Sequence, residues 1–119
     1  TGTRYFRDTF ISYVHYRENG EIATIRVDGI GVGEYDAGQG RIEAEEYFAS
    51  EGISKKELPG GGFAVTHISE GDHLTFPSIR GLAGKRKIVF DGFPKAEAAI
   101  EVRRKAPDGE LLARCSVQK

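Results

Sequence analysis

The sequence predicts an all-β fold, either a β-sandwich or a β-barrel. Short runs of aromatic and β-branched residues recur along the chain, and clusters of Gly and Pro separate them. Apart from a short helical turn expected at residues 47–50, no segment has a helical period. The 119 residues, 39% of them hydrophobic, are enough for a globular domain but not for two full ones.

The first segment predicts a β-hairpin at residues 9–28. Its two strand-like runs, 10–16 and 22–27, flank an Asn19-Gly20 pair, which is typical of a type I′ turn with positive φ at both residues. The aromatic side chains of this segment, Tyr13 among them, could stack on sugar rings or fill a core or an interface. Residues 34–40 follow a run of alternating glycines and carry too little side chain for a core, so a linker is expected there.

A second unit is expected to begin at Arg41. Six strand-like runs follow, at residues 42–48, 63–68, 73–76, 87–90, 98–103 and 111–117. The last run alternates most clearly: it places Leu111, Ala113, Cys115 and Val117 on one face and polar side chains on the other.

Composition narrows the classes of function. Lys and Arg total 17 against 18 Asp and Glu, a net charge of −1, so nucleic acid is not an expected partner. No apolar run is long enough to cross a bilayer, so no membrane partner is expected either. The single cysteine, Cys115, excludes an internal disulfide, and its apolar neighbours favour a buried structural thiol over a nucleophile.

Two carboxylates suggest a metal site. On a strand over residues 42–48, Glu43 and Glu45 project from the same face. Adjacent carboxylates repel each other unless a cation lies between them, and Ca²⁺ prefers such oxygen ligands. The alternative is an acidic strand face that keeps the protein soluble. Catalytic carboxylates face each other across a cleft, so glycosidase chemistry is not expected from this pair.

Two histidines lie at the ends of one expected turn. His67 and His73 flank residues 68–72, so both are predicted near one rim of a sheet. None of the histidines has the spacing of a zinc site. Either they contact a ligand or they are rim residues without a role.

Several motifs after Arg41 resemble those of family 6 carbohydrate-binding modules. The stretch 41–47 (RIEAEEY) is similar to the family's opening strand, 61–74 (GGFAVTHISEGDHL) to its glycine loop and following strand, and 100–103 and 107–112 to later motifs. The resemblance covers residues 41–119 and is incomplete at the C-terminal end. It implies a β-sandwich of jelly-roll type, preceded here by the hairpin and the Gly-rich linker.

The first segment has a second likeness. Residues 7–22 and the glycines after them resemble the closing hairpin of family 43 glycoside hydrolase propellers, of the arabinofuranosidase and xylosidase type. In that family a family 6 module often follows directly. The resemblance therefore implies three parts: a propeller-end hairpin at 1–33, a linker at 34–40 and a binding module at 41–119.

The resemblance also implies roles for residues. Glu43 and Glu45 would help to hold a structural Ca²⁺. His67 occupies the position of an aromatic residue that stacks on a sugar, and Glu70, Asp72 and His73 would hydrogen-bond hydroxyl groups beside it. Imidazole is smaller and more polar than the family's usual side chain, so weaker stacking is expected.

These expectations lead to a hypothesis of non-catalytic binding to a plant cell-wall polysaccharide or oligosaccharide, of the xylan or arabinoxylan type. The chain would be an accessory part of a family 43 glycoside hydrolase in xylan degradation, in an extracellular or periplasmic setting. It would not itself be an enzyme, because the catalytic acids of such a parent would precede Thr1. The alternative is a structural β-sandwich that packs against a glycosidase catalytic domain and stabilises it without binding sugar.

Overall fold

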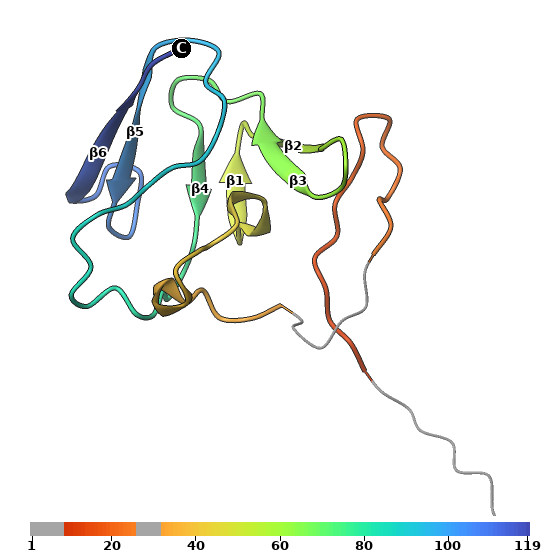
Figure 1. Ribbon diagram of the computed structural model, residues 1–119, viewed down its shortest axis with the longest axis horizontal. Coiled ribbons are helices and arrows are strands. Elements are labelled where there is room, and N and C mark those ends of the chain that lie inside the picture. The colour runs from red at the N-terminus through yellow and green to blue at the C-terminus, as the bar shows by residue number, and fades with distance from the viewer. Residues whose placement is uncertain (1–8, 26–31) are drawn as a thin grey trace, which may run out of the picture. The chain divides into compact units, whose positions relative to one another are not determined.

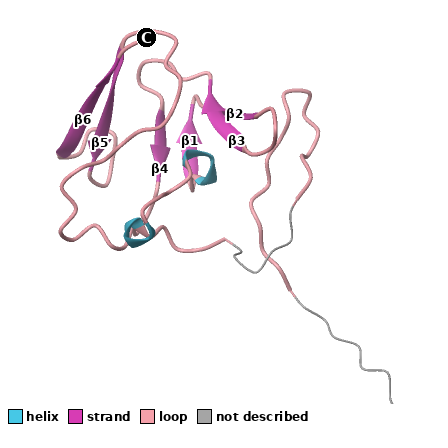
Figure 2. Ribbon diagram, in the orientation of Figure 1, coloured by secondary structure: helices cyan, strands magenta, loops and turns pink. Residues whose placement is uncertain are grey.

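The computed structural model describes residues 9–25 and 32–119, and these residues confirm the all-β prediction (Figures 1 and 2). The described elements are η1 (Ala37–Gln39), η2 (Ala44–Glu46), β1 (Ala49–Glu51), β2 (Ser54–Glu57), β3 (Phe63–Thr66), β4 (His73–Thr75), β5 (Ala98–Arg103) and β6 (Leu111–Val117). Both η elements are single turns of 3-10 helix. The chain packs as two units, one ending at Leu82 and the other beginning at Ala83.

The first unit contains a long, bent hairpin built from four strands. β2 pairs with β3, β1 pairs with β4, and both pairs are antiparallel (Figure 1). Gly52 and Ile53 separate β1 from β2, and the opposite side carries a six-residue excursion at 67–72. A left-handed φ of 56° at His67 ends β3 two residues before its predicted end. The 67–72 loop thus connects β3 to β4 opposite the Gly52–Ile53 connection.

The predicted N-terminal hairpin is present over its described residues. Tyr16 and Ile22 form an antiparallel bridge, and the Ala23 amide donates to the carbonyl oxygen of His15 (2.8 Å). The turn is not of the predicted type I′, since among its residues only Gly20 has positive φ (84°). The Gly20 amide donates to the Arg17 carbonyl oxygen (2.9 Å), as in a three-residue loop with glycine at the left-handed position. Residues 26–28 of the predicted hairpin lie outside the described residues.

The prediction of a strand at 42–48 is wrong. Residues 44–46 form η2, and the Glu46 amide donates to the carbonyl oxygen of Glu43 (3.2 Å). Ala and Glu are depleted in strands, and carboxylates in a first helical turn interact favourably with its amide dipoles. Sheet structure begins instead at β1, where a helical turn was expected, and β2 follows without having been predicted.

The expected linker at 34–40 has an ordered local structure. η1 begins after Asp36, whose carboxylate accepts a hydrogen bond from the Gly38 amide (2.7 Å), and Gly40 ends it with φ of 88°. Asp36 also forms a parallel bridge with Arg80. This backbone pairing ties the segment to a residue more than forty positions later.

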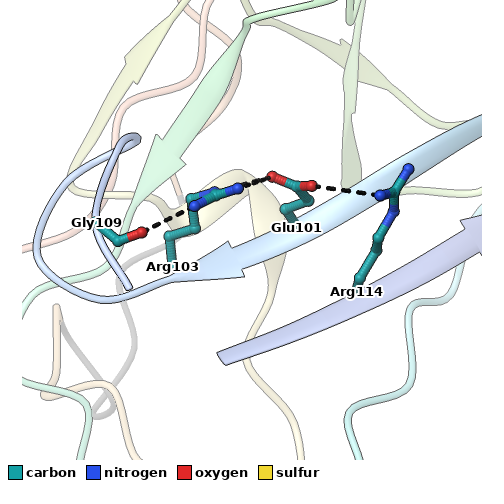
Figure 3. A network of polar contacts seen from close by, with 4 residues as sticks. All are labelled: Glu101, Arg103, Gly109 and Arg114. Carbon is teal, nitrogen blue, oxygen red and sulfur yellow. Dashed lines mark hydrogen bonds and ion pairs between the residues drawn. The ribbon is translucent and has the colours of Figure 1, made fainter. Parts of the chain in front are cut away.

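The second unit holds β5 and β6, whose bounds agree with prediction. The two strands are antiparallel, with a register shift between Val102 and Arg103. In Figure 3, Glu101 receives hydrogen bonds from Arg103 (2.9 Å) and lies 3.9 Å from Arg114, and Arg103 also donates to the Gly109 carbonyl oxygen (2.9 Å). Ala113, Cys115 and Val117 of β6 are half-buried, as predicted for that face, whereas Leu111, predicted on the same face, is 47% exposed.

Residues 87–90 do not form the predicted strand. Their apolar side chains are open to solvent, with Val89 73% exposed, and they pair with none of the described strands. Three basic residues, 85–87, precede the apolar side chains of residues 88–90. The apolar run therefore has only three residues and is charged at its N-terminal end. A run of this length is ordered as a strand only when a partner supplies its hydrogen bonds.

Burial is low in both units. Among the described residues Ala23, at 4% exposure, is the one fully buried hydrophobic side chain. Large apolar side chains such as Phe48 (73% exposed) and Phe93 (100%) face solvent. Within the described ranges no helix is long and apolar enough to span a bilayer.

Candidate functional site

An aromatic cleft of about 590 Å³ lies in the first unit. Its walls combine three tyrosines and a phenylalanine with one ion pair, from segments that are distant in sequence: Tyr13, Glu34, Tyr35, Tyr47, Phe48 and Arg80. Aromatic rings beside a few polar groups are the usual lining of a small-molecule site, and they suit the apolar faces and hydroxyl edges of sugars.

Tyr35, in the wall of the cleft, is held in place by two contacts. Its hydroxyl donates to the Glu46 carbonyl oxygen (2.6 Å), and its ring meets the edge of Phe76 at a centroid distance of 5.1 Å. Burial, and then a hydrogen bond with the Tyr13 hydroxyl, raises the pKa of Tyr35 to about 12. Tyr35 is therefore a neutral hydrogen-bonding group at physiological pH.

Tyr47 lies between the cleft and a group of charges. The Lys55 ammonium is 4.4 Å from the centroid of its ring, a cation–π contact that holds the ring in place. Burial lowers the pKa of Lys55, although Glu45 and Glu46 oppose that change. Phe48 follows Tyr47 and keeps most of its ring exposed at the cleft.

The polar rim of the cleft is the ion pair between Glu34 and Arg80. Two backbone hydrogen bonds position it: the Arg80 amide donates to the Tyr35 carbonyl oxygen (2.8 Å), and the Ala37 amide donates to the Arg80 carbonyl oxygen (2.9 Å). Gly81 adopts a φ of 71°, and a Cβ there would lie 2.5 Å from the Gly38 amide nitrogen. This close approach requires glycine and fixes the chain directly after Arg80.

The residues predicted to contact sugar occupy a different place. His67, Glu70, Asp72 and His73 lie on the 67–72 loop and at the start of β4, and none is among the residues lining the cleft. His67 and Glu70 are exposed. Asp72 accepts a hydrogen bond from the Ser69 amide (2.7 Å), and the Nε2 atom of His73 lies 3.8 Å from a Glu51 carboxylate oxygen. Asp72 and His73 thus have structural contacts within the hairpin.

The predicted calcium ligands do not share a strand face. Glu43 precedes η2 and pairs with Arg41 (2.7 Å), while Glu45 lies within the helical turn. Burial, and then the negative charge of Glu43, raises the pKa of the Glu45 carboxyl, so the two charges do interact. Among the described residues no three His, Cys, Asp or Glu side chains gather around one point. Ca²⁺ takes six to eight oxygen ligands, so Glu43 and Glu45 would need further oxygen atoms to complete a calcium site.

His15 joins the N-terminal hairpin to β3. Its ring stacks on Phe63 with centroids 4.1 Å apart and an interplanar angle of 14°. Its Nδ1 atom is buried and has no hydrogen-bond partner in the described structure. Burial, and then the nearby positive charge of Lys55, lowers the pKa of His15. The same hairpin is tied to β2 by an ion pair between Arg17 and Glu57 (3.0 Å).

Sequence reasoning missed most of the cleft. Tyr13 belongs to an aromatic segment and Tyr47 to a family-like motif, but nothing in the sequence places them near Tyr35, Phe48 or Arg80. The one local signal in the sequence is the pair of adjacent aromatic residues Tyr47-Phe48 at the end of the expected strand. No family model, curated protein or solved structure matches the chain.

Proposed function

We propose that the chain binds a plant cell-wall polysaccharide or oligosaccharide without catalysis, and that the aromatic cleft takes part in binding. The observation that carries this proposal is the gathering of four aromatic side chains and one ion pair around a single hollow. Pyranose rings have apolar faces that stack on aromatic rings, and their hydroxyl groups bond to charged side chains at the edge. The proposed affinity is about micromolar or weaker, because such contacts total a few kcal/mol.

The wider setting belongs to the same proposal. The family resemblance supports a jelly-roll β-sandwich that accompanies a family 43 glycoside hydrolase acting on xylan or arabinoxylan outside the cytoplasm. The 67–72 loop, with His67 at its start, is a second place where sugar could contact this chain. Calcium ligation by Glu43 and Glu45 stays a prediction, and it requires further oxygen ligands beyond those two.

The test is calorimetric titration of the full chain with xylo-oligosaccharides and arabino-oligosaccharides. Phe48 is the sharpest position to change, since its ring lines the cleft yet is mostly exposed, so its removal should leave the fold intact. We expect Phe48→Ala to weaken binding about tenfold, the upper range for one aromatic contact. Phe93→Ala is the matched control, because Phe93 is fully exposed and belongs to the second unit.

Two results would overturn the proposal. One is the absence of heat with every oligosaccharide, and the other is equal binding by the Phe48→Ala and Phe93→Ala variants. A loss of binding in His67→Ala alone would instead assign the sugar site to the 67–72 loop and remove the cleft from the proposal.

A structural role is the second candidate, and one observation favours it. With Ala23 alone fully buried among the described residues, both units leave large apolar side chains uncovered. Packing against a glycosidase catalytic domain would bury such side chains at about 25 cal/mol per Å². This candidate predicts that fusing a family 43 catalytic domain before Thr1 raises the melting temperature of the chain, and it fails if the melt is unchanged.

A further inference from the structure

We propose that the Glu34–Arg80 ion pair makes the cleft selective for uncharged sugars with two adjacent hydroxyl groups, and that it excludes uronic acids. This inference rests on the proposed function and goes beyond it, because it names the chemical feature that the cleft recognises. It arises from three observations: the position of the pair, its exposure and its zero net charge.

The position of the pair is set by backbone and not by the ion pair itself. The parallel bridge between Asp36 and Arg80 and the two flanking backbone hydrogen bonds hold residues 34–37 beside residue 80. Asp36 is in turn occupied as the cap of η1. The two charged side chains therefore start from fixed backbone positions at the edge of the cleft.

The exposure of the pair leaves it able to bind a ligand. The side chains of Arg80 and Glu34 are 66% and 69% exposed, so an ion pair between them contributes little to stability. A guanidinium group has five N–H donors and a carboxylate about four acceptor positions, and one mutual contact uses only a fraction of them. The pair thus offers spare donors next to spare acceptors.

That combination fits neighbouring hydroxyl groups on a sugar. Each hydroxyl both donates and accepts, so one can accept from Arg80 while the next donates to Glu34. The aromatic walls formed by Tyr47 and Phe48 would stack against the ring face and fix which edge reaches the pair.

A uronic acid presents the wrong charge to the same groups. Its carboxylate would compete with Glu34 for Arg80 and would be repelled by the Glu34 carboxylate at short range. Specificity of this kind comes from an unfavourable contact with the wrong ligand as much as from a favourable one with the right ligand. Replacing Glu34 by its neutral isostere should therefore allow a uronic acid to bind.

The experiment titrates the full chain with a xylo-oligosaccharide and with an oligogalacturonate of equal length. We expect the unmodified chain to bind the neutral sugar alone. Glu34→Gln should bind the neutral sugar about tenfold more weakly, since a charged acceptor is lost, and should gain measurable affinity for the oligogalacturonate. Arg80→Gln should lose neutral binding to a similar extent without that gain. Glu97→Gln, an exposed change in the second unit, is the control and should match the unmodified chain.

The outcomes separate this inference from the proposed function. If Phe48→Ala weakens binding while both Glu34→Gln and Arg80→Gln leave it unchanged, the cleft binds sugar but the pair does not select it, and the inference is wrong. Weaker neutral binding without any gain for the oligogalacturonate in Glu34→Gln also overturns the selectivity. If the unmodified chain binds neither sugar, the proposed function itself fails.

Discussion

Replacing His15 by phenylalanine should stabilise the protein, although the histidine makes a well-formed stack. Phenylalanine keeps a flat ring against Phe63, where the centroids now lie 4.1 Å apart, and it removes the buried Nδ1 atom that has no partner among the described residues. Burying an unpaired polar group costs about 1–3 kcal/mol. Since His15 is only half-buried, the lower end applies, and we expect the free energy of unfolding to rise by about 1 kcal/mol near pH 8.

The stability that His15→Phe gains over the unmodified chain should grow as the pH falls. Burial and the Lys55 charge lower the pKa of His15 in the folded protein below the ordinary value of 6.5. The unfolded chain then takes up a proton before the folded protein does, so the unmodified chain loses stability as the pH falls through and below 6.5. Arg17 and Glu57 form an ion pair, so their opposite charges largely cancel. The positive charge of Lys55 is therefore the one that lowers the pKa of His15.

Urea denaturation at about pH 8 and about pH 5 measures both effects. His67→Asn is the control, because His67 is exposed, asparagine tolerates its left-handed φ of 56°, and the change should alter stability by no more than about 0.5 kcal/mol. Destabilisation by His15→Phe at both pH values would refute the argument, and so would an equal loss of stability on acidification in the variant and in the unmodified chain.

Three further predictions concern stability. Glu45→Gln should raise the melting temperature near pH 7 in calcium-free solution, because burial and the charge of Glu43 disfavour the ionised carboxyl of Glu45. This gain in melting temperature should vanish below about pH 4.5, where the carboxyl of the unmodified chain is protonated in the folded and unfolded states. If Glu43 and Glu45 hold Ca²⁺, chelation lowers the melting temperature of the unmodified chain and Glu45→Gln becomes destabilising when calcium is present, whereas an unchanged melt contradicts calcium binding. Gly52→Ala should cost about 1–3 kcal/mol, since Gly52 has a φ of 74° and a Cβ would lie 1.9 Å from an Asp72 carboxylate oxygen; Gly33→Ala, with open space around it, is the control, and equal melts for the two would contradict the strain.

The parts of the fold that sequence predicted well are those whose determinants are local. β6 has a clear alternation, β5 lies close before it in sequence, and both were predicted to the residue. The N-terminal hairpin was predicted from Asn19-Gly20, but its turn type was not, because the same pair suits both a two-residue and a three-residue loop.

The errors come from runs whose structure depends on a partner. Residues 42–48 look strand-like by their apolar spacing, yet the run of Ala and Glu within them forms η2. β1 and β2 have polar or charged sequences, and what makes them strands is pairing with β4 and β3. Cross-strand pairing is a tertiary property, so propensity alone does not reveal it.

The cleft was less predictable than the strands, because it gathers residues from four separate segments. Arg80 is brought to Glu34 by the parallel bridge at Asp36, a contact that leaves no periodic mark on the sequence. The sites that sequence did suggest, around His67 and around Glu43 with Glu45, are clusters of neighbours along the chain. A single sequence shows which functional residues are neighbours along the chain. It does not show which residues from distant segments the fold brings together.

The N-terminal hairpin connects these observations, since three side chains on one of its faces contact the rest of the first unit. Tyr13, His15 and Arg17 are half-buried, while the residues between them are exposed, which is the alternation of a strand with one face covered. Tyr13 lines the aromatic cleft, His15 stacks on Phe63, and Arg17 pairs with Glu57. Side-chain contacts, and not a shared strand ladder, hold this face in place. The stability of the His15 stack therefore bears directly on the cleft, because Tyr13 keeps its position in the wall only while the hairpin stays docked.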